Sequence, residues 1–377
     1  MRRQIITAAG LSMALWLAPW AQAAAKQYWV YIGTYTGPQS KGIYAARFDA
    51  DSGKLETPVL AGEMTRPSFV AIHPNHKYLY AVSETNGSTV SAFEINPKTG
   101  MLTLLNTVPA KGSSACHLVV DRTGKSLVVA NYGNGSVSVF RVGVDGRLSE
   151  STAQVQHSGS GPDKSRQRGP HAHAVVLSPD NRFVFVPDLG IDHILAYRLD
   201  PAQGTITAHD PPFATVPPGS GPRHFAFHPS GKFAYSLNEM KSSVTAFSYD
   251  RGKGALTALQ TIGNLPEDFT GVDNSAEIDI DSAGKFLYAS NRGHDSITIY
   301  KVDGSKGTLT TVDRVLTQGK TPRGFKIDPT GQYLIAGNQD SNSVVVFKRD
   351  AATGRLTPTG QTVSVGSPVC IDYLPIE

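Results

Sequence analysis

A segment of 18 residues recurs in six copies along the chain, and this repeat restricts the possible fold more than any other feature of the sequence. Each copy has an alternating apolar run, a tight turn with Pro, Asn or Gly, and a second run rich in aromatic and β-branched residues. Two strands joined by a turn are the direct interpretation of this pattern. The copies are PSFVAIHPNHKYLYAVSE from Pro67, ACHLVVDRTGKSLVVANY from Ala115, AHAVVLSPDNRFVFVPDL from Ala172, PRHFAFHPSGKFAYSLNE from Pro222, SAEIDIDSAGKFLYASNR from Ser275 and PRGFKIDPTGQYLIAGNQ from Pro322.

A second module of two strands follows the hairpin. A strand, an acidic-glycine turn and a further strand make up SVSVFRVGVDGRL from Ser136, SVTAFSYDRGKGAL from Ser243 and SITIYKVDGSKGTL from Ser296. Each repeat therefore has four strands. Equivalent turn positions lie 47 to 57 residues apart, which is the length of a propeller blade. These positions are His73, Asp121, Ser178, His228, Asp281 and Asp328.

The two ends of the chain supply a seventh blade. SPVCIDYL near Cys370 is a lone first strand, and WVYIGTYT from Trp29, GIYAARFD and LETPVLAG are the other three strands. Pairing the two ends closes the ring and removes the open sheet edge. We therefore predict an all-β fold, a single seven-bladed β-propeller over residues 24–377. The alternative is a β-sandwich or an open β array, but neither would explain a fixed repeat with a split terminal unit.

The first 23 residues have the pattern of a secretory signal peptide. Arg2 and Arg3 precede an uncharged stretch from Ile5 to Trp20, and Ala21-Gln22-Ala23 forms a small-x-small cleavage site. The paired arginines are compatible with the twin-arginine route. A membrane anchor is the less favoured alternative, because the apolar run is shorter than a span of about 20 residues. We predict export to the periplasm.

Composition excludes several classes of partner. The formal charge is +4, no block of Lys or Arg follows the first three residues, and no second long apolar run is present. Neither nucleic acid nor, after signal cleavage, a membrane is therefore expected as a partner. Cys116 and Cys370 fall in non-adjacent blades, so we expect no disulfide between them. No feature of the sequence specifies an oligomeric state.

Comparison of the repeats predicts a functional site at one mouth of the ring. The first strand of a blade lines the channel, so its start and the end of the second strand lie at the same mouth. Ionisable residues concentrate there in the third to sixth repeats, a departure that stability does not require. The equivalent sets are Ser68, Cys116, His173, Arg223, Ala276, Arg323 and Val369; then Phe69, His117, Ala174, His224, Glu277, Gly324 and Cys370; and, after the second strand, Glu84, Tyr132, Leu189, Glu239, Arg292 and Gln339.

Two long loops, His157–His173 and Pro266–Glu277, lead to the same mouth, and long loops on a rigid scaffold usually carry function. His171 and His173 have the spacing of a metal pair on a strand. No acid-rich ligand set accompanies them, so we predict no metal or cofactor and leave a divalent ion in the channel as an alternative.

Other candidates have structural interpretations. His73 and His228 are expected to be turn residues, and the recurring Asn131, Asn238, Asn291 and Asn338 to be structural hydrogen-bond donors. Blade-to-blade salt bridges, with Glu239 as counter-ion, are the alternative for Arg223, Arg292 and Arg323. No nucleophile elbow, CxxC, P-loop or dinucleotide fingerprint is present. The carboxylate, imidazoles and guanidiniums expected at the mouth suit activation of water beside a carbonyl oxygen that gains negative charge. Arginine forks also suit binding of a carboxylate or phosphate.

From Gly219 to Val244, GSGPRHFAFHPSGKFAYSLNEMKSSV resembles the seven-bladed propeller lactonase family, which includes bacterial 6-phosphogluconolactonases and fungal carboxy-muconate cyclases (the cycloisomerase 2 family). The resemblance continues through PEDFTG, FLYASNRGHDSI and TPRGFKIDPTGQYLIAGNQ, and covers nearly all of the mature chain. It implies the opening or closing of a lactone. By motif it also implies a catalytic His, Arg, Glu and second Arg at His173, Arg223, Glu239 and Arg292, with Arg323 as the alternative second Arg.

We expect an exported hydrolase of an aldono-δ-lactone, with glucono-δ-lactone favoured because a sugar phosphate is made in the cytoplasm. Glu239 or His173 would be the general base, and Arg223 and Arg292 would stabilise the oxyanion. Two alternatives are a phosphorylated or dicarboxylic lactone in the same site, and a propeller that only binds a partner. The residues expected to hold the sugar are His117, Arg166, Gln167, His171, Glu277 and Arg323.

Overall fold

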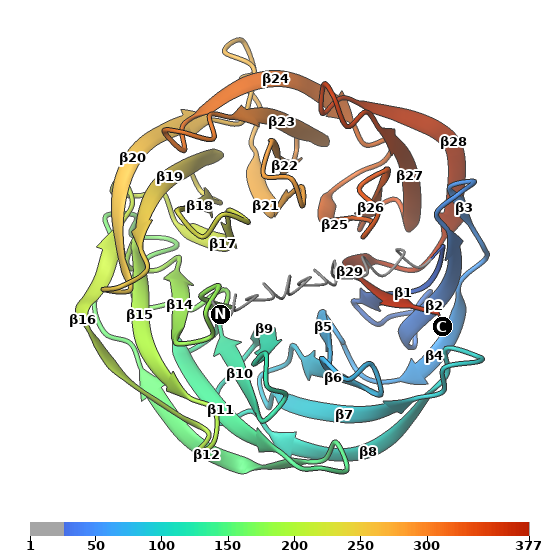
Figure 1. Ribbon diagram of the computed structural model, residues 1–377, viewed down its shortest axis with the longest axis horizontal. Coiled ribbons are helices and arrows are strands. Elements are labelled where there is room, and N and C mark those ends of the chain that lie inside the picture. The colour runs from blue at the N-terminus through green and yellow to red at the C-terminus, as the bar shows by residue number, and fades with distance from the viewer. Residues whose placement is uncertain (1–25, 377) are drawn as a thin grey trace, which may run out of the picture.

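Seven antiparallel sheets form a closed ring in the computed structural model, which describes residues 26–376. The sheets stand around a central channel, with the first strand of each blade innermost and the fourth at the rim (Figure 1). This confirms the predicted seven-bladed β-propeller. The predicted signal peptide, residues 1–23, lies outside the described residues. None of the helices in the described part of the chain has the length and apolarity that crossing a membrane requires.

Six blades follow one another along the chain, and each begins with one of the six repeat copies. Blade 2 comprises β5 (Phe69–Ile72), β6 (Tyr78–Ser83), β7 (Thr89–Ile95) and β8 (Leu102–Pro109). Blade 3 comprises β9 (Ala115–Val120), β10 (Ser126–Asn131), β11 (Ser136–Val142) and β12 (Leu148–Gln156). Blade 4 comprises β13 (Val176–Leu177), β14 (Phe183–Asp188), β15 (His193–Asp200) and β16 (Thr205–Thr215).

The second half of the ring repeats this pattern. Blade 5 comprises β17 (Pro222–Phe227), β18 (Phe233–Asn238), β19 (Ser243–Asp250) and β20 (Ala255–Gly263). Blade 6 comprises β21 (Asn274–Ile280), β22 (Phe286–Arg292), β23 (Ser296–Val302) and β24 (Leu309–Leu316). Blade 7 comprises β25 (Pro322–Ile327), β26 (Tyr333–Asn338), β27 (Ser343–Arg349) and β28 (Leu356–Ser364).

Blade 1 joins the two ends of the chain, as predicted. Its innermost strand, β29 (Pro368–Pro375), pairs with β1 (Gln27–Thr34), which pairs in turn with β2 (Gly42–Asp49). The outer strand is split into β3 (Lys54–Leu55) and β4 (Val59–Glu63), both paired with β2. Because the last strand completes the first sheet, the ring has no free inner edge at the junction of its termini.

The hydrophobic core is divided into seven clusters, one at each interface between neighbouring blades. Between blades 3 and 4, for example, Val128 and Val139 pack with Val184 and Val186, all fully buried. Successive residues of a strand point to opposite faces of its sheet, so each blade supplies apolar side chains to both neighbours. Because both faces of every sheet are apolar, each blade packs against two neighbours and the blades form a ring.

The repeated turn positions form equivalent hydrogen bonds in six blades. The backbone N–H of each donates to the carbonyl oxygen five residues later, over 2.8 to 3.0 Å. His73 and His228 are turn residues, as predicted, and their Nε2 atoms lie 3.0 Å from the carbonyl oxygens of Gly124 and Gly284 in the next blade. The turn histidines thus connect adjacent blades.

The recurring asparagines are fully buried and structural, as predicted. The Nδ2 atoms of Asn131, Asn238 and Asn291 each donate to two hydroxyl groups of the adjacent third strand, over 3.0 to 3.2 Å. Asn338 instead donates to the Thr317 carbonyl oxygen. Cys116 and Cys370 are both buried free cysteines, in blades 3 and 1.

One predicted strand is shorter than expected. The copy that starts at Ala172 keeps only the two residues of β13, apart from an isolated bridge between Ala172 and Asp188. The neighbouring strand presents Pro187, whose carbonyl oxygen accepts from the N–H of His173 but which has no N–H to return. The missing donor interrupts the ladder and leaves His173 on irregular backbone.

A buried ion pair between blades 6 and 7 is expected to contribute strongly to stability. Arg349 and Asp281, 4% and 3% exposed, form this pair, and Arg349 Nε also donates to the Tyr288 hydroxyl over 2.8 Å. Arg349→Ala leaves a buried carboxylate unpaired and is expected to lower the free energy of unfolding by about 3–5 kcal/mol in urea titrations.

The matched control is Arg355→Ala, which removes an ion pair with Asp313 between the same two blades. Its guanidinium is 58% exposed, so a loss of about 0–1 kcal/mol is expected. Equal losses in the two variants would contradict the assignment of the buried pair.

Candidate active site

β-Bulges set the positions that the repeat comparison predicts to lie at the mouth. In blade 5, Pro222 pairs with Asn238 and His224 with Leu237, so Arg223 is an extra residue without a partner on β18. Arg323 in blade 7 and Cys116 in blade 3 are bulged in the same way. A bulge turns a side chain away from its regular direction. The side chains of the bulged arginines therefore do not follow the alternation of the strand, which buries the neighbouring side chains between blades.

Glu239 is the centre of the charged cluster at this mouth. It directly follows β18 and is 5% exposed. Its Oε2 lies 3.0 Å from Nε of Arg223 and 2.9 Å from an Nη of Arg292, and its Oε1 lies 2.7 Å from an Nη of Arg166. Nε2 of His173 lies 4.0 Å from Oε2. The four residues predicted as catalytic are thus brought together by three blades.

The three guanidiniums determine the protonation of Glu239. Burial by itself would raise the pKa of this carboxyl, but Arg292, Arg223 and Arg166 lower it to about 2. The cluster therefore keeps a net positive charge at neutral pH. Burial lowers the pKa of His173 well below its usual range, and the charges of Arg223 and Arg323 act in the same direction. At neutral pH, His173 is an uncharged imidazole beside an excess of positive charge.

The two arginines inside the cluster are held by backbone carbonyl groups. Arg223 donates through an Nη to the carbonyl oxygen of Ala276, and Arg292 donates to those of Asn274 and Ser275 over 3.1 Å. These acceptors belong to β21, next to the second long loop. That loop thus serves the site through its backbone, which supports two guanidiniums at fixed positions.

The long loop before blade 4 is fastened to the scaffold by Asp188. Its Oδ2 lies 2.6 Å from Nδ1 of His157, with both side chains fully buried, and its Oδ1 accepts from the N–H of His171 over 2.7 Å. This loop carries Arg166 to the Glu239 carboxylate. The Arg166 side chain is 37% exposed, the most accessible of the three guanidiniums.

Gln167 is placed differently from the sequence expectation. It is fully buried, and its amide nitrogen donates to the Leu189 carbonyl oxygen and to Asp192 over 2.8 and 2.9 Å. It has no surface to offer a sugar in this structure. Its hydrogen bonds instead hold the loop that presents Arg166, so the expectation of a sugar-binding Gln167 is corrected to a structural role.

His171 lies at the edge of the cluster. Its Nδ1 donates to the Tyr132 carbonyl oxygen over 2.8 Å, and its ring stacks on the Tyr132 ring at a centroid distance of 4.5 Å. The Tyr132 hydroxyl accepts from Arg166 over 3.4 Å. Because Nδ1 carries the proton of the neutral ring, Nε2 of His171 is left as an acceptor.

Arg323 has no carboxylate within ion-pair distance among residues 26–376. Its guanidinium lies over the Tyr35 ring, 5.1 Å from the centroid. The Tyr35 hydroxyl donates to Glu84 over 2.9 Å, and burial raises the pKa of Tyr35 to about 12. The cation of Arg323 is thus not neutralised by a salt bridge.

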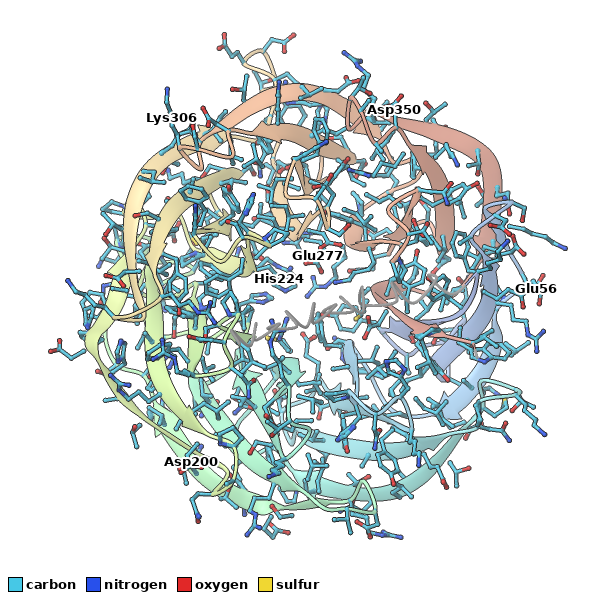
Figure 2. The ribbon with its side chains drawn as sticks, viewed as in Figure 1. Glu56, Asp200, His224, Glu277, Lys306 and Asp350 are labelled. Atoms are coloured by element: carbon cyan, nitrogen blue, oxygen red, sulfur yellow. The ribbon has the colours of Figure 1, made fainter. Side chains whose placement is uncertain are left out.

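His117 and Glu277 lie deeper, inside the channel. Glu277 Oε1 is 2.7 Å from Nδ1 of His224, and the His117 ring contacts the His224 ring edge-to-face at 5.2 Å. Figure 2 shows His224 and Glu277 near the centre of the ring. A cavity of about 290 Å³ adjoins them; its lining also includes Phe69, Asp279, Phe325, Lys326 and Cys370.

Seven of the ten predicted residues fall into two groups, and Gln167, His171 and Arg323 lie outside them. His173, Arg223, Glu239, Arg292 and Arg166 meet at the mouth, while His117 and Glu277 belong to the channel. Four further residues that the sequence analysis did not assign to the site lie in or beside these groups. Three of them, Glu84, Tyr132 and His224, already stood at equivalent ring positions in the comparison of the repeats. The fourth, Tyr35, directly follows β1 and was not part of that comparison.

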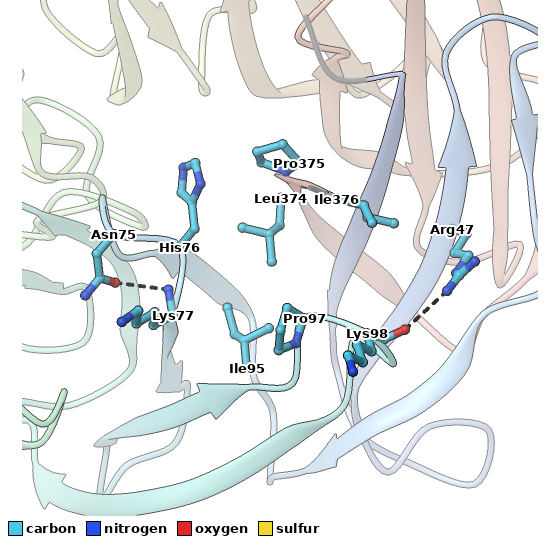
Figure 3. A pocket seen from close by; sticks show the side chains of 10 residues that line it. All are labelled: Arg47, Asn75, His76, Lys77, Ile95, Pro97, Lys98, Leu374, Pro375 and Ile376. Carbon is cyan, nitrogen blue, oxygen red and sulfur yellow. Dashed lines mark hydrogen bonds between the residues drawn. The ribbon is translucent and has the colours of Figure 1, made fainter.

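A larger hollow of about 550 Å³ lies at the opposite end of the ring, between blades 1 and 2 (Figure 3). Its polar groups are mostly exposed Lys and Arg side chains, and Arg47 donates to the Lys98 carbonyl oxygen over 3.2 Å. It has no buried acid or imidazole pair. We therefore place the candidate active site at the mouth and not in this hollow. Among the described residues, no three His, Cys, Asp or Glu side chains are grouped so as to hold a metal ion.

Comparison with known proteins gives a consistent result. The chain matches the family model described as "Lactonase, 7-bladed beta-propeller" over residues 29–373. A Bacillus subtilis (strain 168) protein named 6-phosphogluconolactonase is 39% identical over 349 residues, 92% of this chain and 99% of that protein. A 6-phosphogluconolactonase of Formosa agariphila is 35% identical over 305 residues, 79% of this chain and 86% of that protein. The structure of a Pseudomonas aeruginosa periplasmic gluconolactonase has a TM-score of 0.88 and 33% identity, and covers 93% of this chain and 100% of that one.

The low pKa of Glu239 predicts a specific loss of stability in acid. A carboxyl whose pKa is lowered by folding, here from 4.5 to about 2, stabilises the native state above pH 4.5, and this stabilisation is lost as the pH falls towards 2. It amounts to about 3 kcal/mol at neutral pH. Glu239→Gln removes it, so the stability gap between wild type and variant is expected to narrow by about 2 kcal/mol from pH 7 to pH 3 in urea unfolding.

Glu267→Gln, at an exposed position of the nearby loop, is the control, and its gap to the wild type should be near zero at both pH values. A Glu239→Gln gap of the same size at pH 7 and pH 3 would contradict the assignment of a low pKa.

Proposed function

The chain belongs to the seven-bladed β-propeller lactonase family, and we propose that it hydrolyses the δ-lactone of an aldonic acid, with glucono-δ-lactone as the favoured substrate. Membership confirms the resemblance seen in the sequence. The observation that carries the proposal is the Glu239 cluster, in which three guanidiniums and a neutral imidazole converge at one mouth. The likeness to a periplasmic gluconolactonase supports the favoured substrate.

The positive mouth suits the transition state of ester hydrolysis. Attack of water on the lactone carbonyl places negative charge on its oxygen, and donors fixed beforehand stabilise that charge. Arg292 and Arg166 have side chains 14% and 37% exposed, whereas that of Arg223 is 3% exposed. We infer that Arg292 and Arg166 contact the oxyanion, while Arg223 fixes Glu239 and adds its positive charge.

His173 is the better of the two expected bases. The carboxylate of Glu239 has a pKa of about 2 and is shared by three guanidiniums, which makes it a poor proton acceptor. Glu239 therefore orients the guanidiniums and does not take the proton of water. His173 is uncharged at neutral pH, lies 4.0 Å from Glu239, and has a free lone pair to accept that proton.

A second candidate is the hydrolysis of a phosphorylated lactone. Arg323 supports it, because this cation lacks a carboxylate partner in the described part of the chain and a phosphate would neutralise it. The names of the Bacillus and Formosa relatives agree with this candidate. The predicted export favours the first candidate, since glucose oxidation in a periplasm would supply an unphosphorylated lactone.

The substrate assignment predicts turnover of glucono-δ-lactone by the mature protein in EDTA, after subtraction of spontaneous ring opening. Arg292→Ala is expected to lower kcat about 10²–10³-fold, because one oxyanion donor is lost. Arg251→Ala, on an exposed turn, is the control. Turnover of the 6-phosphate alone would establish the second candidate, and no turnover of either lactone would reject both.

We also propose that the protein is exported, from the charged, apolar and small-x-small pattern of residues 1–23. When the full chain is expressed in a Gram-negative host, the protein is expected in the osmotic-shock fraction with Ala24 as its first residue, as determined by N-terminal sequencing. A chain without residues 2–23 is the control and should remain in the cytoplasm. A product that retains Met1 in the membrane fraction would instead establish an anchor.

A further inference from the structure

Three buried imidazoles form a continuous series from the mouth into the channel. The ring centroids of His173 and His224 are 5.5 Å apart, and those of His224 and His117 are 5.2 Å apart, both in edge-to-face contact. Their exposed fractions are 5%, 6% and 9% in the order His173, His224, His117. Packing does not require imidazoles at the positions of His117 and His224, since other blades hold Phe69, Ala174, Gly324 and Cys370 there.

His224 differs from its two neighbours because it has a carboxylate partner. Its Nδ1 lies 2.7 Å from Oε1 of Glu277, with side chains 7% and 16% exposed. Among residues 26–376, the groups near the ring nitrogens of His173 are instead the Cys116 sulfur at 3.8 Å and Glu239 at 4.0 Å. When Glu277 is ionised, Nδ1 of His224 donates to it and Nε2 keeps a lone pair. The pair is therefore arranged to accept a proton at Nε2.

The proposed reaction releases one proton in each turnover. The oxygen of water bonds to the lactone carbonyl carbon, and the bond from that carbon to the ring oxygen breaks. One hydrogen of water ends on the former ring oxygen as a hydroxyl. The other is released when the new carboxylic acid ionises, because its pKa is about 4. This proton has to leave a mouth that already carries an excess of positive charge.

We propose that His224 and Glu277 form a proton-accepting pair that takes the reaction's proton from His173 and passes it to the water of the central channel. The inference rests on the proposed lactonase function and deepens it. The transfer requires a water that bridges the nitrogens of neighbouring imidazoles, as ordered waters bridge polar groups in many proteins. Glu277 stabilises the imidazolium of His224 as a carboxylate does in a catalytic triad. Glu277 is then a positioning residue that acts through His224, in place of its expected contact with the sugar.

The charges around the pair favour transfer away from the mouth. Burial lowers the pKa values of both His173 and His224, and the charges of Arg223, on the same strand as His224, and of Arg323 act in the same direction. Only His224 has a carboxylate at hydrogen-bonding distance to offset them. The other charged or titratable groups that face the pair from neighbouring strands and loops are His117, Glu239, Asp279, Arg292 and Lys326.

Chemical rescue tests the proposal. Removal of the ring in His224→Ala enlarges the cavity of about 290 Å³ that His224 lines, which makes room for imidazole from solution. Hydrolysis of the substrate lactone is measured in a pH-stat without buffer and then with increasing imidazole. We expect kcat to fall about 10²-fold, with KM little changed, and to recover as imidazole is added. Glu56→Gln, at the exposed rim of blade 1, should behave as the wild type.

Glu277→Gln gives a second measurement. The amide still accepts from Nδ1 of His224 but lacks the charge that stabilises an imidazolium. The acid limb of the kcat–pH profile is therefore expected to move to lower pH, with a lower plateau. A residue that only supports the fold would change neither the position of this limb nor the response to imidazole.

Several results would overturn the proposal. They are an undiminished kcat in both variants, a loss that imidazole does not restore, or a change confined to KM. For variants that do not fold, nitrogen NMR of wild-type His224 decides: the Nδ1–H tautomer supports the pair, and the Nε2–H tautomer rejects it. Wild-type protein that opens no lactone would reject the proposed function as well, whereas an active wild type with variants that are not rescued rejects the pair alone.

Discussion

A single carboxylate, that of Glu239, lies within 3.0 Å of three guanidiniums from three different parts of the chain. Isolated, these buried cations would repel one another and would each require solvation. The shared carboxylate makes their approach possible and still leaves the cluster positive. Arg166 from a loop, Arg223 from a bulge and Arg292 from the end of a strand thereby become one site. The chemistry proposed for the mouth depends on this excess of charge.

The scaffold fixes these groups with features that serve little else. The bulge at Arg223 releases the residue from strand pairing, so that its side chain reaches the end of the neighbouring strand. Asp188 and Gln167 hold the loop that carries Arg166. Pro187 interrupts the inner strand of blade 4 and places His173 on irregular backbone. The bulge recurs in blades 3 and 7, whereas the long loop and the interrupted strand are local exceptions to a regular blade, and such exceptions concentrate at functional sites.

The mouth and the channel have opposite electrostatic character. The mouth holds an excess of guanidinium groups around Glu239, which favours an oxyanion. The channel below it contains Glu277 and Asp279, and burial raises the pKa values of both carboxyls. His224 lies at the boundary between the two regions. This arrangement provides proton-accepting side chains along the path of the proton, and positive charge where the carbonyl oxygen has to be stabilised.

Much of the fold follows from the sequence alone. The repeat length, the alternation of apolar residues and the split terminal blade were sufficient to predict seven blades and their closure by β29. The convergence of His173, Arg223, Glu239 and Arg292 was also predictable, because a repeat of constant length places equivalent residues at equivalent points of the ring. The length of the repeat and the alternation of residues within a strand can both be seen directly in the sequence.

The features that do not recur from blade to blade could be determined only from the tertiary structure. Gln167 and Arg166 are adjacent in an irregular loop, and only the folded loop shows that one is enclosed while the other reaches Glu239. The pairing of His224 with Glu277 joins two blades, and the direction of both side chains depends on bulges that the repeat pattern does not reveal. A repeat specifies where along a strand a residue lies. Which way its side chain turns, and what it meets across the blade boundary, depends on packing between segments distant in the sequence.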